Sequence, residues 1–187
     1  MRIDRVTHIG MALLVGVLGV PNAVGAQGHE MRAAVECQLL RVSGTTLAGV
    51  NGELSLVART PLVLIADAGW ARKQTEVSEL SVTSHIVTFG GGVRLMPGRS
   101  RVRPFVQIVA GGENVGVRGS LGAVTGSASK TWFQLEPGTG FHVHVGPRVA
   151  IAASLHVRRV FLEEAVFEVP SETQFRALAG VSVQLRK

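Results

Sequence analysis

Apolar and polar side chains alternate along most of the chain after residue 26, with a period of two residues. The clearest segment is the last one, where one set of alternate positions is apolar and the other is polar or small. The apolar set is Phe175, Ala177, Ala179, Val181, Val183 and Leu185, and the other set is Arg176, Gly180, Ser182, Gln184 and Arg186. Such alternation is typical of β-strands whose two faces meet different surroundings. The pattern therefore predicts an all-β fold.

The alternating segments and the turn sequences between them predict eight strands. The strands are expected at residues 33–43, 46–58, 62–73, 82–96, 101–115, 129–145, 148–161 and 173–186. Short turns are expected at 59–61, 97–100 and 146–147, and longer loops at 74–81, 116–128 and 162–172. An even strand number with short turns on one side and long loops on the other is how up-and-down outer-membrane barrels are built. The Gly, Ser, Ala and Thr content of 116–128 predicts a mobile loop.

Alternation alone does not decide whether the apolar faces meet a soluble core or lipid. The later segments alternate over ten or more residues, which matches the roughly 9–11 tilted residues that cross a bilayer. The polar face mixes glycines with long charged side chains, as the filled interior of an eight-stranded barrel requires. We therefore predict an eight-stranded antiparallel up-and-down transmembrane β-barrel with its apolar faces outward. A soluble periplasmic barrel that holds an apolar ligand, as lipocalin-like folds do, is the alternative.

Charged side chains on the inward face of such a barrel need partners, because an isolated buried charge is costly. We predict an interior network in which three acids neutralise several of four arginines. The acids are Glu53, Asp67 and Glu136, and the arginines are Arg94, Arg103, Arg158 and Arg176. A lumen filled in this way is expected to be plugged.

The chain begins with the three parts of a cleavable secretory signal peptide. Two arginines precede an apolar run over residues 9–20, and small residues at 24–26 suit cleavage. The apolar run covers twelve residues, whereas a spanning helix needs about 20. We expect residues 1–26 to be removed and residues 27–187 to form one outer-membrane β-barrel domain.

Charge and cysteine content narrow the classes of partner. Without residues 1–26 the chain has 17 Lys and Arg against 12 Asp and Glu, a net charge of +5. The basic residues are scattered, and together with the export signal this argues against a nucleic-acid partner. Cys37 is the only cysteine, so no internal disulfide can form. It lies too far from the expected cleavage site for lipidation, and we expect a buried or wall-facing thiol.

From residue 89 onward the glycine-rich strands carry a resemblance to a known family. The motifs are Phe89-Gly90-Gly91-Gly92-Val93-Arg94, Arg103-Pro104-Phe105-Val106-Gln107 running to Ala110-Gly111-Gly112, Pro137-Gly138-Thr139-Gly140-Phe141 and Leu178-Ala179-Gly180-Val181-Ser182-Val183. The chain resembles the outer-membrane protein β-barrel domain family, the eight-stranded group related to the transmembrane domain of outer membrane protein A. The resemblance implies an outer-membrane location, contact with its lipid, and insertion by the barrel assembly machinery. It implies neither a shared active site nor a cofactor. We expect a monomer that acts in envelope integrity or in surface interaction through its longer loops.

Three features depart from the pattern of that family. Aromatic girdles are expected at the membrane interfaces, yet the chain has no Tyr and two Trp. Members of the family usually close with an aromatic residue that assists recognition by the assembly machinery, whereas this chain ends Leu185-Arg186-Lys187. Pro104 and Pro137 lie inside predicted strands, where a proline removes a ladder hydrogen bond and suits a bulge or strand edge.

One group of residues could support catalysis. Ser154 and His156, followed by Glu163 and Glu164, supply the hydroxyl, imidazole and carboxylate of an acyl-transfer set. Some eight-stranded outer-membrane enzymes remove acyl chains from lipid A with such a set, and this is a lower-ranked alternative. Because Ser154 and His156 alternate with apolar residues, they are expected to face the lumen and pack there.

A second pair could contribute to a metal site. His142 and His144 lie two residues apart on one strand face, a spacing that can chelate a metal when a third ligand approaches. With no clear carboxylate or cysteine partner nearby in sequence, we interpret them as interior hydrogen-bonding groups and expect no bound metal.

Overall fold

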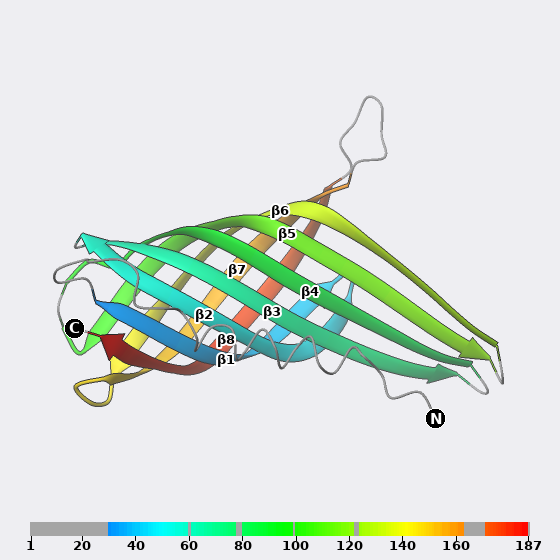
Figure 1. The fold of residues 1–187 in the computed structure, drawn as a ribbon, viewed down its shortest axis with the longest axis horizontal. Coiled ribbons are helices and arrows are strands. Elements are labelled where there is room, and N and C mark those ends of the chain that lie inside the picture. Colours follow the sequence, from blue (N-terminus) through cyan, green and yellow to red (C-terminus); the bar gives the residue numbers. More distant parts are fainter. Residues whose placement is uncertain are drawn as a thin grey trace.

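The computed structural model describes residues 30–59, 61–77, 80–98, 100–121, 124–162 and 171–186. Eight antiparallel strands follow one another around a closed barrel in sequence order (Figure 1). They are β1 (Met31–Val42), β2 (Thr45–Arg59), β3 (Leu62–Val77), β4 (Leu80–Leu95), β5 (Val102–Leu121), β6 (Val124–His144), β7 (Val149–Phe161) and β8 (Ser171–Arg186). The predicted all-β, eight-stranded architecture is confirmed. The predicted signal peptide, residues 1–26, lies outside the described residues.

The barrel closes because β1 pairs with β8, for example with Val35 opposite Val181. The beginning of β1 and the end of β8 therefore lie at the same end of the barrel as the connections at 60–61, 96–101 and 145–148. We call this end the turn end. The opposite end, to which β3, β4, β5 and β6 run furthest, is the extension end (Figure 1). Among the described residues no helix is long and apolar enough to cross a membrane.

At the extension end, β1 and β2 are joined by a two-residue turn. Ser43 has a φ of 46° and Gly44 a φ of 78°. Two central residues with positive φ form the turn type whose twist matches that of an antiparallel hairpin. The Ser43 hydroxyl also donates a hydrogen bond to the carboxylate of Glu172 in β8, which ties the first hairpin to the last strand.

The prediction of long loops at 74–81 and 116–128 is wrong, because strands occupy most of both segments. Strands β3 and β4 continue to a connection at 78–79, and β5 and β6 continue to a connection at 122–123. The segment 116–128, expected to be a mobile loop, is paired β-structure on both sides of its connection. The alternation fades there because a sheet with water on both faces needs no apolar side, while the backbone ladder continues unchanged.

The four continued strands lie side by side and form a sheet that projects beyond the rest of the barrel (Figure 1). We call residues 72–77, 80–85, 116–121 and 124–129 the extension. Its first row, from strand to strand, is Arg72, His85, Gly116 and Ser129. The extension is thus held by the same ladder that forms the barrel wall.

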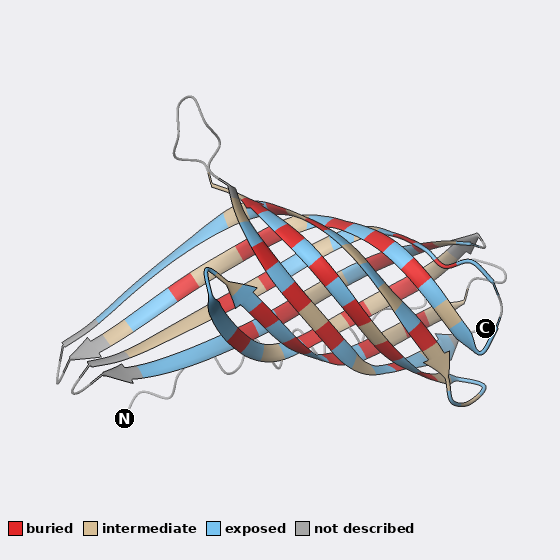
Figure 2. Ribbon diagram, turned by 180° about the vertical axis from the view of Figure 1, so that it is seen from behind, coloured by how far each residue is buried: buried red, intermediate tan, exposed pale blue. Residues whose placement is uncertain are grey.

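Apolar side chains of the barrel wall point outward and polar ones inward, as predicted. In β7, Ile151 is 48% exposed and Leu155 is 66% exposed. Ser154 and His156, the residues on either side of Leu155, are buried. Figure 2 shows the same alternation of buried and exposed positions along the neighbouring strands. Cys37 is exposed on the outer side of β1, in agreement with a wall-facing thiol. This orientation contradicts the alternative of a soluble barrel built around an apolar ligand.

Each of the two strand prolines lies at a position where its strand is paired with a neighbouring strand on one side only. The β4–β5 pairing ends at Leu95 and Val106, so Pro104 lies beyond the last β4 partner. The β6–β7 pairing passes from Leu135 to Gly138 without pairs at the two residues between them, one of which is Pro137. A proline tolerates such positions because no neighbouring carbonyl requires its N–H group.

Candidate functional site

Arg176 lies in the middle of the lumen and links four other strands. Its Nη1 lies 3.0 Å from Asp67 Oδ2 and 2.9 Å from Glu136 Oε1. Its Nε donates a 2.9 Å hydrogen bond to Gln38 Oε1. Its Nη2 donates a 2.5 Å hydrogen bond to Asn51 Oδ1, so the contacts of Arg176 join β8 to β1, β2, β3 and β6 across the barrel interior.

Arg158 of β7 is the second centre of the network and has no exposed surface. Its Nε donates to Glu136 Oε2 at 2.6 Å, and its Nη1 donates to Glu113 Oε2 at 3.0 Å. The other oxygen of Glu113 accepts a 2.9 Å hydrogen bond from Gln174. Glu136 therefore serves both Arg158 and Arg176.

Arg94 of β4 pairs with a different carboxylate. Two of its nitrogens lie 2.9 Å and 2.5 Å from the two oxygens of Glu53, and its Nε donates to Gln107 at 2.7 Å. Its guanidinium carbon also lies 4.2 Å from the ring centroid of Phe105. The bidentate pair and the cation–π contact together hold this side chain in one orientation.

The structure brings six of the seven residues of the predicted interior network into ion pairs: Glu53, Asp67, Arg94, Glu136, Arg158 and Arg176. Arg103 is placed elsewhere. It lies at the turn end, where its Nε donates a 3.3 Å hydrogen bond to the carbonyl of Ser100, and no carboxylate of a described residue pairs with it. Sequence reasoning missed Glu36 and Glu113, which are also buried in the lumen. Alternation with its outward neighbours Val35 and Cys37 was a signal that could have identified Glu36, whereas Glu113 lies between Gly112 and Asn114 and carries no such signal.

Glycines on the inward face make room for the larger side chains of the network. A Cβ atom at Gly69 would lie 2.8 Å from Arg176 Nη2, and one at Gly138 would collide with the ring of His156. Small residues therefore face large ones across the lumen, and the interior is filled rather than open.

Two apolar clusters lie on either side of the charged centre. The cluster toward the turn end contains Val63, Ile65, Met96, Phe105 and Val109. The cluster toward the extension end contains Leu40, Leu47, Ala71 and Ile86. An apolar cluster therefore lies on each side of the central pairs, and the Arg94–Glu53 pair lies at the level of the turn-end cluster, with Arg94 directly opposite Val63 in the β3–β4 ladder.

The hydroxyl and imidazole proposed for acyl transfer do lie together. His156 Nε2 lies 2.8 Å from Ser154 Oγ, and His156 Nδ1 lies 3.0 Å from Glu136 Oε1. The neighbouring carboxylate is thus Glu136, while Glu163 and Glu164 lie outside the described residues. All three side chains are buried in the lumen, and Glu136 is held by two arginines. The arrangement packs the interior and does not face the lipid from which an acyl substrate would arrive.

The histidine pair His142 and His144 lies near the turn end. His142 is buried, and its ring packs edge-on against Phe105 with 5.3 Å between the ring centroids. Arg103 lies directly opposite His142 in the β5–β6 ladder. In the part of the chain that the structure describes, no group of three or more His, Cys, Asp or Glu residues could hold a metal ion.

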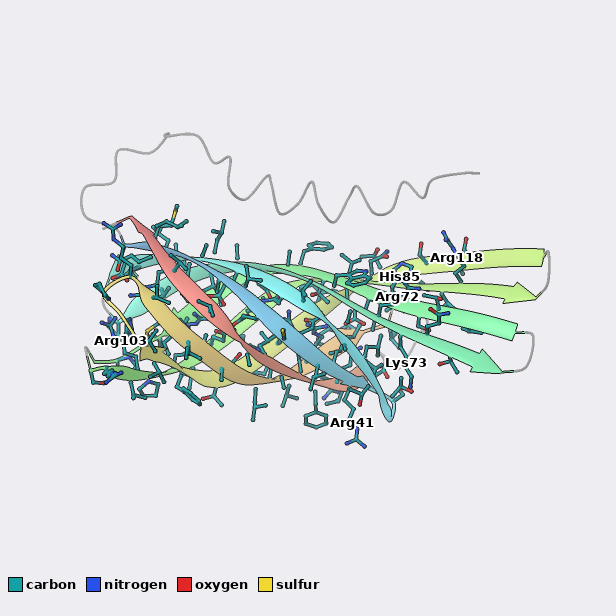
Figure 3. The ribbon with its side chains drawn as sticks, turned by 90° about the horizontal axis from the view of Figure 1, so that it is seen from below. Arg41, Arg72, Lys73, His85, Arg103 and Arg118 are labelled. Atoms are coloured by element: carbon teal, nitrogen blue, oxygen red, sulfur yellow. The ribbon has the colours of Figure 1, made fainter. Side chains whose placement is uncertain are left out.

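The extension carries basic side chains on both of its faces. Arg72, His85 and Arg118 follow the outward-facing positions of the barrel wall, and Lys73 lies on the opposite face (Figure 3). Arg72 donates a 3.2 Å hydrogen bond to Gln74. The same four segments contain one acidic residue, Glu76. The extension is therefore a basic sheet at one end of the barrel.

No family model and no curated protein matches the chain. Among solved structures, it is similar to Ail, the attachment invasion locus protein of Yersinia pestis (14% identity, 84% of this chain and 97% of Ail, TM-score 0.58). A second Ail structure contains the heparin analogue sucrose octasulfate. It is also similar to Neisserial surface protein A (20% identity, 87% and 100%, TM-score 0.57). A major outer membrane protein from Thermus thermophilus superimposes with a TM-score of 0.67 (10% identity, 85% and 100%).

These neighbours share few residues with the chain, and what they share with it is the architecture. Each is covered almost completely by the matching region. The architecture of this chain is a closed antiparallel barrel whose strands follow one another in sequence order. The chain has the fold of the eight-stranded outer-membrane β-barrels, which confirms at the level of the fold the resemblance inferred from its glycine-rich strands.

Proposed function

We propose that the protein is an integral outer-membrane β-barrel with a closed lumen, which displays the extension at the cell surface for interaction with other molecules. The observation that carries this proposal is the orientation of the wall, apolar outside and charged inside. Such a wall is stable when lipid surrounds the barrel, because lipid replaces water as the outer solvent. In barrels of this type the short turns are periplasmic, so the turn end faces the periplasm and the extension faces the medium.

Cysteine labelling of intact cells tests the location and the orientation together. In a Cys37→Ser background, Ser127→Cys places a thiol on the extension, and Ser100→Cys places one at the turn end; both positions are exposed. A membrane-impermeant maleimide is expected to label the first variant on intact cells and the second only after the outer membrane is permeabilised. Recovery of the protein in the aqueous periplasmic fraction, or the reverse labelling pattern, contradicts the proposal.

A second candidate function is binding of a sulfated polysaccharide by the extension. The basic side chains Arg72, His85 and Arg118 favour a polyanionic partner, and Ail has been crystallised with a heparin analogue. Electrostatic binding of this kind weakens as salt rises. We expect the purified barrel to bind immobilised heparin at low salt and the double variant Arg72→Gln/Arg118→Gln to bind it less. The matched control Arg148→Gln, at the turn end, is expected to bind like the unmodified protein, and equal binding by all three contradicts this candidate.

A further inference from the structure

The inner wall near the turn end carries several basic side chains, one of which, Arg103, has no carboxylate partner among the described residues. Arg103 of β5, Arg32 of β1 and the imidazoles of His142 and His144 of β6 gather there. Arg103 is the ladder partner of His142, and Arg32, Arg103 and Glu30 all lie close enough to His144 to act on it electrostatically. The carboxylates at this level are already engaged, Glu30 by Arg32 and Glu53 by Arg94.

The strand ladders fix this cluster. Arg103 and His142 are direct partners in the β5–β6 ladder, and His144 lies two residues further along the same face. The backbone nitrogen of His144 donates a 2.8 Å hydrogen bond to the carbonyl of Arg101, and Arg101 Nε donates to the carbonyl of His144 at 3.1 Å. The backbone beneath the imidazoles is therefore held by the adjacent turn.

Small side chains separate the two histidines from Arg32. The inward positions across β7, β8 and β1 in the row of His144 are Ala150, Ser182 and Ala34. None of these side chains fills the space between opposite walls. Arg32, one inward position beyond Ala34, can therefore reach the region that His144 faces.

Several polar atoms of this cluster have no partner among the described residues. They are His142 Nδ1 and both ring nitrogens of His144, all of them buried. His142 itself is only 2% exposed. Buried polar groups are satisfied in the great majority of cases. Arg103 likewise has no carboxylate partner among the described residues. The interior arginines Arg94, Arg158 and Arg176 each have one.

We propose that the turn-end mouth of the barrel binds a phosphate-type oxyanion between Arg103, Arg32, His142 and His144. Such an ion accepts hydrogen bonds from guanidinium and imidazole N–H groups, and it supplies the counter-charge that Arg103 lacks. Free phosphate and the phosphodiester headgroup of a lipid are the two sources of this chemistry. The site lies at the opposite end from the extension, so the proposal is independent of what the extension binds.

Histidine ring spectroscopy tests the site directly. The full-length barrel, labelled with ¹⁵N-histidine and folded in phosphate-free maltoside micelles, is titrated with inorganic phosphate at constant ionic strength adjusted with chloride. The ring nitrogens of His142 and His144 are expected to shift in a saturable way, while those of His85 in the extension stay in place. Arg103→Gln is expected to abolish the saturable shift, and its matched control Arg118→Gln, on the same strand in the extension, is expected to retain it.

A second titration identifies the source of the oxyanion. Short-chain phosphatidylglycerol replaces inorganic phosphate at the same concentration. Saturable shifts with either probe support the site, and the stronger probe names the source. The proposal is overturned if neither probe shifts the two rings, if Arg103→Gln responds like the unmodified protein, or if His85 shifts in parallel. Heat-modifiability on gels of each variant shows whether it is folded, so that a folding defect is not mistaken for loss of binding.

Discussion

Glu136 is the most heavily shared carboxylate of the lumen. Its two oxygens meet Arg158 and Arg176, and His156 lies 3.0 Å from one of them. A buried ion network of this kind gives little net stability over a well-packed apolar interior, but removal of one partner leaves an uncompensated charge. The stability of the barrel therefore depends on the network being complete rather than on any single pair.

Substitution of Glu136 tests this dependence. Glu136→Gln retains the shape of the side chain but removes the charge opposite two arginines, and we expect the free energy of unfolding to fall by about 3–5 kcal/mol. Urea unfolding of the protein folded in lipid vesicles measures the change. Glu172→Gln is the matched control, because Glu172 makes an exposed contact with Ser43, and an exposed polar pair contributes up to about 1 kcal/mol. Equal losses in the two variants would show that the interior carboxylate has no special role.

Individual residues also show what the sequence can and cannot predict. Alternation places Glu53, Asp67 and Arg94 on the inward face correctly, because the side-chain period of a strand is two residues. It does not give the height at which an inward side chain meets one from a distant strand, since that height is set by the stagger of the closed barrel. Alternation therefore assigns Arg103 to the central pairs, although it lies near the turn end with the two histidines.

The strands are predictable where lipid imposes a pattern and unpredictable where it does not. In β7 and β8, apolar side chains recur at the outward positions, and the predicted bounds lie within two residues of the observed ones. In β5 and β6, the alternation disappears beyond Gly116 while pairing continues to Leu121 and Val124. Sequence patterns thus identify the membrane-facing part of a strand, and cross-strand pairing determines its full length.

Because the extension is added to a ladder that is already closed, it should be dispensable for folding. Replacing residues 74–83 and residues 118–127 each with Asn-Gly, the preferred sequence of a two-residue hairpin turn, shortens both hairpins at a matched register. We expect the shortened barrel to fold and to migrate differently on gels before and after boiling, as the unmodified protein does. Loss of heat-modifiability in the shortened protein would mean that the extension takes part in building the barrel.

The whole molecule combines an apolar outer wall with an interior that is filled around its charged centre. The charged centre neutralises itself through pairs between β1, β2, β3, β5, β6, β7 and β8, and an apolar cluster lies on each side of it. A water-filled path for ions would have to cross both clusters and separate the central pairs. The closed barrel is therefore a rigid support for its two ends rather than a pore.

Single-channel recording tests this view of the molecule. We expect purified barrels inserted in planar bilayers to show negligible conductance, because ions meet an apolar cluster on each side of central charges that are already paired. Heat-modifiability of the same preparation verifies that the inserted protein is folded, and a known open porin serves as the control for insertion and recording. A stable, large conductance from folded barrels would contradict the closed lumen, and the arginines and carboxylates of the interior would then have to be interpreted as the lining of a channel.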